Sequence, residues 1–515
     1  MISEVTSQKV LEFTLLIVAS SMTILLYRRW KTTPSLPPGP SGLPVLGYLP
    51  FIGKNLPHEF AKLAQRFGPI FTLQLGSNIC IIITSSDLAK AVVHDQANIF
   101  ANIAPPLVDR LLKYNNKGIT LSDNKMYWRN MRKVMVFEIM SNKNMEASLS
   151  LRKDGVRKTI KHVYESMGTG VNIADSAFST SLSVVTSLVL GKSLDQDEQN
   201  HNLGEDRLQD VITRLINLLG AQKISGFLPI LARLDLQGVQ EKINCEFQKF
   251  DEILQRIIDD RLSVKSKEST EKHGRKDFLQ ILLELRQQNS SSSYSIPQIK
   301  ALLVVVFVAG TDTSASMVEW AMAELLKYPE VMKKTREELE QVIGLDTIVE
   351  ESHLPILRYL DAVIKEALRL HPPLPFLIRQ SPNESCKVGE YTIPKGLNIY
   401  LNIWAIQRDP QYWENPSEFN SKRFLNTDEY VNKFKYNGSN TNFLPFGSGR
   451  RICPGIPMGE KMFMYLLASL VHSFHWTLPD PKELELSDEF GFLLKKRNPL
   501  VAIPSQRLAN KHLYM

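Results

Sequence analysis

Cysteine is scarce in this sequence of 515 residues. It occurs only at Cys80, Cys245, Cys386 and Cys453, and no two of these form a C-x-x-C pair. A disulfide framework needs thiols in a denser pattern, and a zinc site at Cys453 would need a second thiolate or a histidine closer than His472. We therefore expect the folded body to occupy a reducing compartment and disfavour both kinds of site.

The sequence also lacks internal repeats and a large excess of one charge. Its 61 Lys and Arg residues stand against 54 Asp and Glu, which leaves a net charge of +7 at pH 7. The excess is spread along the chain, so we expect no nucleic-acid partner. The missing repeats disfavour solenoids and propellers. With 43% hydrophobic and 22% charged residues, the chain is typical of a protein with a large buried core.

One apolar run stands near the N-terminus, from Phe13 to Tyr27, and a basic cluster from Arg28 to Lys31 follows it. Extended slightly at its start, the run reaches the roughly 17–20 residues that a membrane span needs. The basic residues predict a single-pass anchor with the rest of the chain in the cytosol. A cleaved signal peptide is the alternative, disfavoured because the small-residue cleavage pattern is missing and the charge follows the run.

Three segments follow from this pattern: a membrane anchor over 1–31, a stiff proline-rich connector over 32–50, and one large domain over 51–515. Within the domain, "HEFAKLAQRFG" predicts a helix and "PIFTLQLGSNICIIITS" a hairpin. Residues 121–285 read mostly as amphipathic helices. Strand-like text occurs in "KVGEYTIPKGLNIYLNIWAI". We therefore predict a mainly α fold with small β-sheets, preceded by one transmembrane helix.

The longest predicted helix begins after the N-cap Ser295 and ends at Tyr328, before Pro329. Its first half, "ALLVVVFVAG", is apolar on every side, so the helix should run through the core. Within it, "AGTDTS" combines glycine with residues that compete for the backbone. A threonine hydroxyl bonded to the carbonyl one turn earlier would open the helix and leave a polar groove. An ordinary packing notch is the alternative for this segment alone.

Cys453 lies in "FLPFGSGRRICPG". Gly447 and Gly449 favour a tight turn, and Pro454 suits the first position of a helix. Cys453 would then sit at a helix N-terminus, which favours a thiolate. A buried thiolate needs a cation, and a haem iron is a suitable one. Arg451 would face an anionic group. A structural buried cysteine is the alternative.

The stretch resembles the haem-binding signature F-x-x-G-x-R-x-C-x-G of the cytochrome P450 superfamily, and the likeness extends over essentially the whole chain. The matching residues are Phe446, Gly449, Arg451, Cys453 and Gly455. The resemblance implies haem b as cofactor, with Cys453 as the axial ligand of its iron and Phe446 and Arg451 beside the haem.

Other motifs follow the family's order. "AGTDTS" resembles the acid–alcohol pair, which implies that Asp312 and Thr313 deliver protons during oxygen activation. "WRNMRK" resembles W-x-x-x-R, which implies that Trp128 and Arg132 approach a haem propionate. Arg379 in "HPPLPFLIRQ" resembles a further propionate ligand.

The family's E-x-x-R pair corresponds to Glu366 and Arg369, joined by Arg423 in "FNSKRF". Here Ser421 and Lys422 replace the usual Pro and Glu, which puts the local turn in doubt. The resemblance implies a structural role near the haem for this trio.

Three apolar stretches would line the substrate cavity by position: Ile103 to Leu107, Val304 to Val308 and Leu374 to Ile378. They suit an uncharged lipophilic substrate. "GLPVLGYLP", "LARLDLQG" and "LNIWAIQRDPQYWENP" resemble the plant microsomal branch that contains cadinene 8-hydroxylase, an oxidase of sesquiterpenes.

The resemblance implies a monooxygenase of the endoplasmic-reticulum membrane that receives electrons from NADPH–cytochrome P450 reductase. We expect it to be monomeric, in contact with lipid, and to hydroxylate a sesquiterpene or another terpenoid. A flavonoid or phenolic hydroxylase is the alternative for the substrate. A haem-thiolate isomerase or dehydratase and a non-catalytic haem sensor are alternatives for the reaction, disfavoured because they need no proton relay.

Overall fold

The computed structural model describes residues 36–102, 119, 122, 126–191, 205–221, 235, 237–265, 276–288, 294–380, 384–425, 434–480 and 484–515. The predicted anchor, residues 1–31, lies outside these ranges. So does the first predicted cavity stretch, Ile103 to Leu107.

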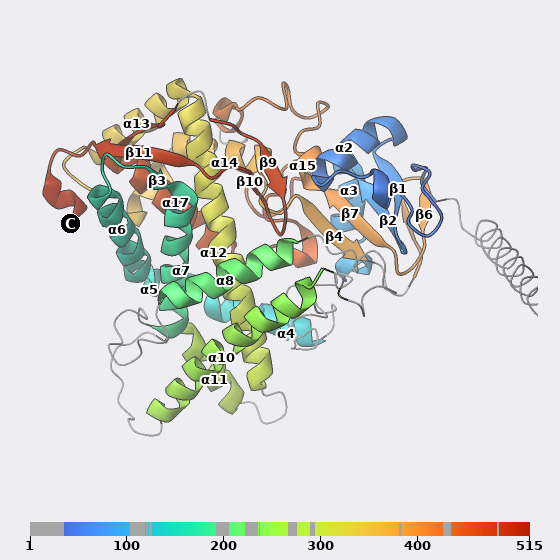
Figure 1. Ribbon diagram of the computed structural model, residues 1–515, viewed down its shortest axis with the longest axis horizontal. Helices are drawn as coiled ribbons and strands as arrows, with labels where there is room; N and C mark the ends of the chain where they lie inside the picture. The colour runs from blue at the N-terminus through green and yellow to red at the C-terminus, as the bar shows by residue number, and fades with distance from the viewer. Residues whose placement is uncertain are drawn as a thin grey trace, which may run out of the picture.

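Helices make up most of the body, and the long helix α12 runs through its middle (Figure 1). Around it lie helices from distant parts of the chain, and α7 and α17 both contact it. The larger helices are α2 (Leu56–Phe67), α4 (Met126–Lys133), α5 (Asn142–Ala147), α6 (Leu149–Glu165), α7 (Ile173–Leu190), α8 (Glu205–Gly220), α10 (Val239–Lys265), α11 (Phe278–Gln288), α12 (Ile296–Lys327), α13 (Pro329–Ile343), α14 (Arg358–Leu370) and α17 (Ile456–Ser473).

Short helical turns connect these elements. They comprise η1 (Leu49–Phe51), α3 (Ser86–Lys90), η2 (Ala91–Asp95), η3 (Ile99–Ala101), η5 (Val134–Ile139), η8 (Glu351–Ile356), α15 (Ile403–Ile406), η9 (Ser421–Phe424), η10 (Gly449–Arg451) and η12 (Lys511–Tyr514). The segment "IWAI", which ends the predicted strand region, instead forms the short helix α15, so the strand prediction is wrong there. The side chain of Asn402 accepts the N–H of Ala405 and caps this helical turn.

The largest sheet has the strand order β1-β2-β7-β4. Its strands come from both ends of the chain, and Figure 1 shows the blue N-terminal strands beside the orange C-terminal ones. β1 (Ile70–Leu75) and β2 (Asn78–Ile83) form the predicted hairpin, β2 pairs parallel with β7 (Asn398–Asn402), and β7 pairs antiparallel with β4 (Phe376–Gln380). This sheet positions Arg379.

The remaining sheets are small and antiparallel. β3 (Val171–Asn172), β11 (Val501–Gln506) and β8 (Phe474–Thr477) form one of them. Two hairpins complete the described sheets: β5 (Cys386–Val388) with β6 (Tyr391–Ile393), and β9 (Asp488–Phe490) with β10 (Leu494–Lys496). The prediction of a mainly α fold with small sheets is confirmed for the described residues.

The long helix has the predicted ends. The backbone N–H of Ser295 donates to Oε1 of Gln298 at 2.7 Å, and Pro297 lies in the first turn. Tyr328 caps the other end, and Pro329 begins α13. Two described helices, α7 and α12, are long and apolar enough to cross a membrane, but both are mostly buried inside the body. They are core helices of the domain.

The described part of the proline-rich connector is packed against the domain. Thr72 of β1 donates its backbone N–H to the carbonyl of Pro38 at 2.9 Å and its hydroxyl to that of Pro37 at 2.7 Å. A Cβ at Gly39 would lie 1.9 Å from the carbonyl oxygen of Thr72, so a larger residue has no room there. The connector is therefore fixed to β1 from Pro37 onward.

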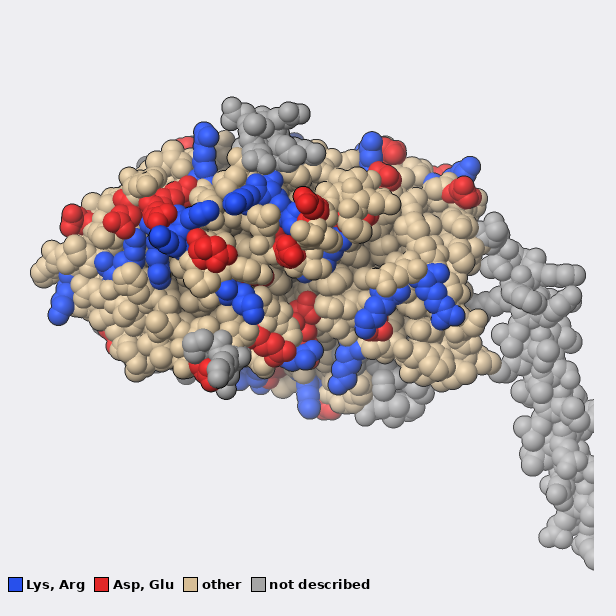
Figure 2. All heavy atoms as spheres, turned by 90° about the horizontal axis from the view of Figure 1, so that it is seen from above, with Lys and Arg blue, Asp and Glu red and all other residues tan. Residues whose placement is uncertain are grey.

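Charges of both signs mix on the surface. On the face seen from above, Lys and Arg stand beside Asp and Glu in several places, with broad uncharged areas between them (Figure 2). The positive net charge is therefore not gathered into one region of this face.

Candidate active site

Cys453 lies in a tight turn between η10 and α17. Its backbone N–H donates to the carbonyl of Phe446 at 2.9 Å, and the N–H of Gly455 donates to its Sγ at 3.4 Å. Gly449 adopts a φ of +67°, and a Cβ there would lie 2.4 Å from the carbonyl oxygen of Val93. Only glycine fits this position without strain. The turn thus presents the sulfur with a hydrogen-bond donor already in place.

The predicted start of the following helix is wrong. Gly455 is the N-cap of α17, and Pro457 lies in the first turn in place of Pro454. The reason is that residues 454 and 455 form a turn, which brings the Gly455 N–H back onto the sulfur. The donor to Sγ is therefore an N–H of this turn.

Burial raises the pKa of the Cys453 thiol, while the Gly455 N–H and the charge of Arg132 act in the opposite direction. Burial has the larger effect, because an anionic sulfur loses its hydration inside the protein. Without a bound metal ion, the site favours the protonated form of Cys453, the thiol. A metal ion bound to the sulfur reverses this preference, since a coordinating thiol loses its proton. The donor chemistry fits an iron ligand.

Trp128 and Arg451 pack together beside this turn. The Cζ atom of Arg451 lies 4.2 Å from the centre of the Trp128 ring. The indole Nε1–H donates to the carbonyl of Ile119 at 2.8 Å. The Arg451 guanidinium donates to backbone carbonyls as well, to Ala101 at 2.8 Å and to Ser122 at 2.5 Å. Sequence motifs far apart in the chain thus meet here.

Two further guanidiniums lie close to this pair. Arg132, on α4, has its Cζ 5.7 Å from the centre of the Trp128 ring. Arg379, on β4, is only 5% exposed and donates to the carbonyls of Ile378 at 2.9 Å and Ser448 at 3.3 Å. Burial, together with the charge of Arg451, lowers the pKa of Arg379 to about 10.

These three cations, of which Arg379 is buried and Arg132 and Arg451 are partly buried, are the main test of whether a haem fits. Burial also lowers the pKa of Arg132, against the effect of Cys453. Arg451 lowers the pKa of Arg379, and both of these guanidiniums donate to backbone carbonyls, so the cluster is suited to an anionic group. Haem carries two carboxylates in addition to its iron, so the thiol and the guanidiniums fit its two kinds of group.

Phe446 precedes the Cys453 turn and lies beneath α17. Its ring makes an edge contact with Tyr436 at 5.0 Å between centroids. A Cβ at Gly459 would lie 3.6 Å from the Phe446 ring, an ordinary van der Waals distance, so the ring packs directly against this turn of α17. The phenyl group thus holds the turn against the helix.

The segment "AGTDTS" lies in the middle of α12. Thr313 donates its hydroxyl to the carbonyl of Ala309 at 2.6 Å, as predicted, and Thr311 does the same to Phe307 at 2.7 Å. The helix nevertheless continues without interruption through Lys327. The predicted opening of the helix is therefore not present.

One face of this helix is nevertheless open. Ala309 is exposed, and Val305 and Thr313, one turn away on either side, are partly exposed. The helix is otherwise mostly buried. An exposed strip inside a core helix leaves room for a bound group, and Thr313 places a hydroxyl on that strip.

Asp312 points to a different side of α12. Its side chain is 6% exposed, and Oδ1 lies 2.6 Å from Nζ of Lys495 on β10. Oδ2 is buried and has no hydrogen-bond partner in the described structure. Burial raises the pKa of Asp312, and Lys495 opposes this rise. Sequence reasoning missed Lys495, which no motif surrounds.

The predicted trio around Glu366 is complete. Arg369 donates from Nε and Nη2 to the two carboxylate oxygens, both at 2.7 Å, and Arg423 donates from Nε at 3.2 Å. Asn420 adds its backbone N–H at 2.9 Å and accepts the N–H of Lys422 on its side chain. Asn420 thus caps the turn where the family motif has changed, and the trio is kept.

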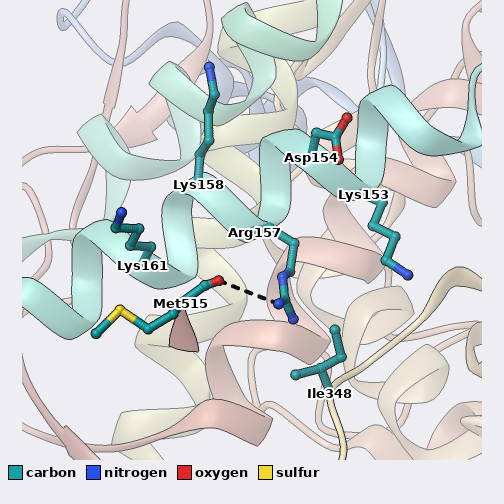
Figure 3. Close-up of a pocket in the computed structure, with 7 residues that line it drawn as sticks. All are labelled: Lys153, Asp154, Arg157, Lys158, Lys161, Ile348 and Met515. Atoms are coloured by element: carbon teal, nitrogen blue, oxygen red, sulfur yellow. Dashed lines mark hydrogen bonds between the residues drawn. The ribbon is translucent and has the colours of Figure 1, made fainter. Parts of the chain in front are cut away.

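A separate hollow of about 400 Å³ lies on the outer side of α6 (Figure 3). None of the residues predicted to bind haem lines it. Its lining consists of four basic side chains, one acidic side chain, one isoleucine and one methionine: Lys153, Asp154, Arg157, Lys158, Lys161, Ile348 and Met515. We assign the chemistry to the Cys453 region and not to this hollow.

Comparison with known proteins agrees with the geometry. A geranylhydroquinone 3''-hydroxylase from Arnebia euchroma is 35% identical over 506 residues, which cover 96% of this chain and 99% of that protein. A flavonoid 3'-monooxygenase from Crocosmia x crocosmiiflora is 34% identical, with 96% and 97% covered. A zebrafish cytochrome P450 structure with abiraterone has a TM-score of 0.74 at 22% identity, covering 88% of this chain and all of that one, and shows the same fold.

Residues 37–503 match the Cytochrome P450 family as a whole. The match includes every motif around the site, from Trp128 to Cys453. This chain therefore belongs to the cytochrome P450 family and is a haem-thiolate monooxygenase.

Proposed function

We propose that this monooxygenase hydroxylates a terpenoid, and specifically a sesquiterpene. The observation that carries the proposal is the apolar character of the open strip of α12, where Val305 and Ala309 lie beside the hydroxyl of Thr313. By its position in the sequence, the uncharged stretch Leu374 to Ile378 would extend this wall. Such walls bind hydrocarbon by burial of apolar area and give little hydrogen bonding to a polar substrate. One relative, the geranylhydroquinone 3''-hydroxylase, is named for a substrate that contains an isoprenoid chain.

A phenolic substrate is the second candidate. The flavonoid 3'-monooxygenase among the relatives supports it, at nearly the same identity as the geranylhydroquinone enzyme. A screen of microsomes with added reductase and NADPH, using terpene hydrocarbons and phenolics with mass spectrometry of the products, tests both. Product from phenolics alone would replace our proposal by this candidate, and product from neither class would refute both.

Each site residue has a proposed task. Cys453 binds the haem iron as a thiolate, while Arg451, Arg379 and Arg132 hold the propionates. Trp128 supports two of these guanidiniums through its ring. Phe446 packs beneath the turn. Bound haem supplies the activation of molecular oxygen.

The remaining steps concern protons. Asp312 holds a proton that can leave from Oδ2, and Thr313 presents its hydroxyl oxygen on the open strip. A hydroxyl that donates to a backbone carbonyl keeps lone pairs with which it can accept a further hydrogen bond. An isomerase or dehydratase would need neither group, so their presence supports proton-dependent oxygen chemistry.

We expect Thr313→Ala to keep haem and substrate binding but to divert electrons from NADPH into hydrogen peroxide. Product formed per NADPH should fall on the order of tenfold, because a positioned proton-transfer group is lost. Product and peroxide are measured together. Thr313→Ser should keep the coupling, and Thr311→Val, which removes an equivalent hydroxyl from the buried side, should leave it unchanged. Unchanged coupling in Thr313→Ala would refute the role.

We also propose that residues 1–31 anchor the chain in the endoplasmic-reticulum membrane, that 32–50 connect, and that 51–515 form the catalytic domain in the cytosol. The domain would receive electrons from NADPH–cytochrome P450 reductase. The basic residues after the apolar run support this orientation.

Deletion of Met1 to Lys31 should release much of the protein from membranes and leave haem binding intact. The described domain begins later, and its contacts at Pro37 and Pro38 remain in the truncated chain. Sedimentation of membranes and the carbon monoxide spectrum measure the two effects. Part of the protein should stay bound through exposed apolar side chains at Leu43, Val45 and Phe51. Loss of the haem spectrum in a folded truncation would contradict the proposed boundary.

A further inference from the structure

The β9–β10 hairpin links the sheet region to the central helix. On β9, Asp488 accepts a hydrogen bond from Nδ2 of Asn55 at 2.6 Å and lies 3.0 Å from Nε2 of His58. On β10, the backbone N–H of Leu494 donates to the carbonyl of Pro373 at 2.9 Å. These contacts fix both strands, so the next residue, Lys495, leaves the hairpin from a defined position.

Lys495 lies between solvent and the buried carboxyl group of Asp312. Its side chain is 38% exposed, whereas that of Asp312 is 6% exposed, and Nζ lies 2.6 Å from Oδ1. An ion pair with one buried member is held more firmly than a surface pair, since the carboxylate has lost its water. The pair occupies Oδ1 and leaves Oδ2 as the oxygen without a partner.

The other described charged groups nearby, Lys496 and Asp175, act on Glu319 and are not among the groups that act on Asp312. Glu319, two turns along α12, accepts a backbone N–H, and its pKa is raised mainly by burial. Lys496, Lys495 and Asp175 all act on Glu319. Among the described charged side chains, Lys495 is the one that acts on Asp312, and it does so through both charge and a hydrogen bond.

We propose that Lys495 is a positioning residue for proton delivery, which holds Asp312 by Oδ1 and so reserves Oδ2 for the transferred proton. The inference rests on the role proposed above for Asp312. In each cycle the carboxyl group gives up the proton from Oδ2 toward the hydroxyl of Thr313 on the open strip and becomes a carboxylate paired with the ammonium. A proton from solvent then restores the acid, so one proton passes from solvent to the open strip without a change in redox state.

Lys495 could instead act only as a structural contact between the hairpin and α12. The two roles differ in what a conservative variant restores. Lys495→Arg keeps the positive charge and the hydrogen bond, Lys495→Met keeps most of the apolar stem, and Lys495→Gln keeps a donor without the charge. Arg497→Met, which removes an exposed cation from the residue after β10, is the matched control.

Infrared difference spectra of the haem-loaded full chain test the pairing without turnover. The carboxyl absorption that disappears in Asp312→Asn is titrated with pH. Because the ammonium stabilises the carboxylate, its removal in Lys495→Met should raise the pH at which this absorption is half-formed. Lys495→Arg and Arg497→Met should titrate close to the wild type, and Lys495→Gln should resemble Lys495→Met.

The second readout is the product formed per NADPH, with the compound of highest turnover in the microsomal screen as the probe. We expect a several-fold fall in Lys495→Met, recovery in Lys495→Arg, and no further fall when Lys495→Met is added to Asp312→Asn. An unshifted titration would overturn the inference, and so would a shifted titration with unchanged coupling, or additive losses in the double variant. If the wild type itself oxidised no compound of the screen, the proposed function would fail instead, and the infrared titration would still decide the pairing.

Discussion

Cys453→Ala should abolish oxidation and remove the long-wavelength carbon monoxide band that thiolate ligation produces. Cys453 is the residue of the turn that offers a sulfur to the iron, with the Gly455 N–H directed at it. Loss of the ligand removes the donation of electron density that assists cleavage of the O–O bond, so we expect no residual product above background. The spectrum of reduced protein with carbon monoxide measures ligation separately from turnover.

The other cysteines supply the controls. Cys80 is buried and directs its Sγ to the carbonyl of Leu73 at 3.3 Å, and burial raises its pKa to about 12. Cys80→Ser keeps a donor to that carbonyl and should keep the band, as should Cys386→Ser and the exposed Cys245→Ser. Cys453→His should give an imidazole-like spectrum where haem is retained. If Cys453→Ala kept the thiolate band, the assignment of the iron ligand would be wrong.

Glu366→Ala should prevent the accumulation of folded, haem-loaded protein at 37 °C. Glu366 and Arg369 are both fully buried, and the carboxylate accepts from Arg369, Arg423 and the backbone of Asn420. Truncation leaves the Arg369 guanidinium buried without its carboxylate. Breaking a buried pair in this way costs about 3–5 kcal/mol, a large part of the roughly 5–15 kcal/mol by which proteins are stable.

The matched variant is Glu350→Ala. Glu350 pairs with Lys153 at 2.6 Å, but both side chains are well exposed, at 45% and 38%. An exposed pair contributes about 0–1 kcal/mol, and the Glu350 side chain also caps η8, a contact that contributes about 1 kcal/mol. The loss should therefore stay well below that of Glu366→Ala, and the haem content should stay near that of the wild type. Haem content per polypeptide and thermal unfolding measure both variants. Equal midpoints for Glu366→Ala and Glu350→Ala would show that the trio does not hold the fold.

Local sequence predicted the parts of this protein whose causes are local. The long helix could be placed because Ser295 and Pro329 mark its ends, and the β1–β2 hairpin because its turn is short. The turn at Cys453 could be recognised because its glycines are demanded by backbone geometry, as Gly449 shows against Val93. The start of α17 was misplaced because Pro454 suits both a turn and a first helical position.

Contacts between distant segments could not be predicted in this way. Lys495 lies in a short basic stretch that carries no motif. Its ion pair with Asp312 depends on how the hairpin packs against Asn55 and Pro373. The family resemblance supplied Arg379 and Arg423, which composition and periodicity alone would have left as surface cations. It also left the turn at Ser421 in doubt, because Ser421 and Lys422 replace the usual Pro and Glu and the motif does not specify the residue at Asn420, which caps the turn.

The cluster of guanidiniums beside Cys453 has a consequence for the life of the protein in the cell. Until the cofactor arrives, Arg379 and Arg451 keep two positive charges in each other's field, with Arg379 fully inside the body. In a newly made chain, backbone carbonyls and the Trp128 ring offset part of this repulsion, and a group that binds the folded state stabilises it by mass action. Haem supply should accordingly set how much of this enzyme escapes proteolysis, so that its abundance follows haem synthesis even at constant translation.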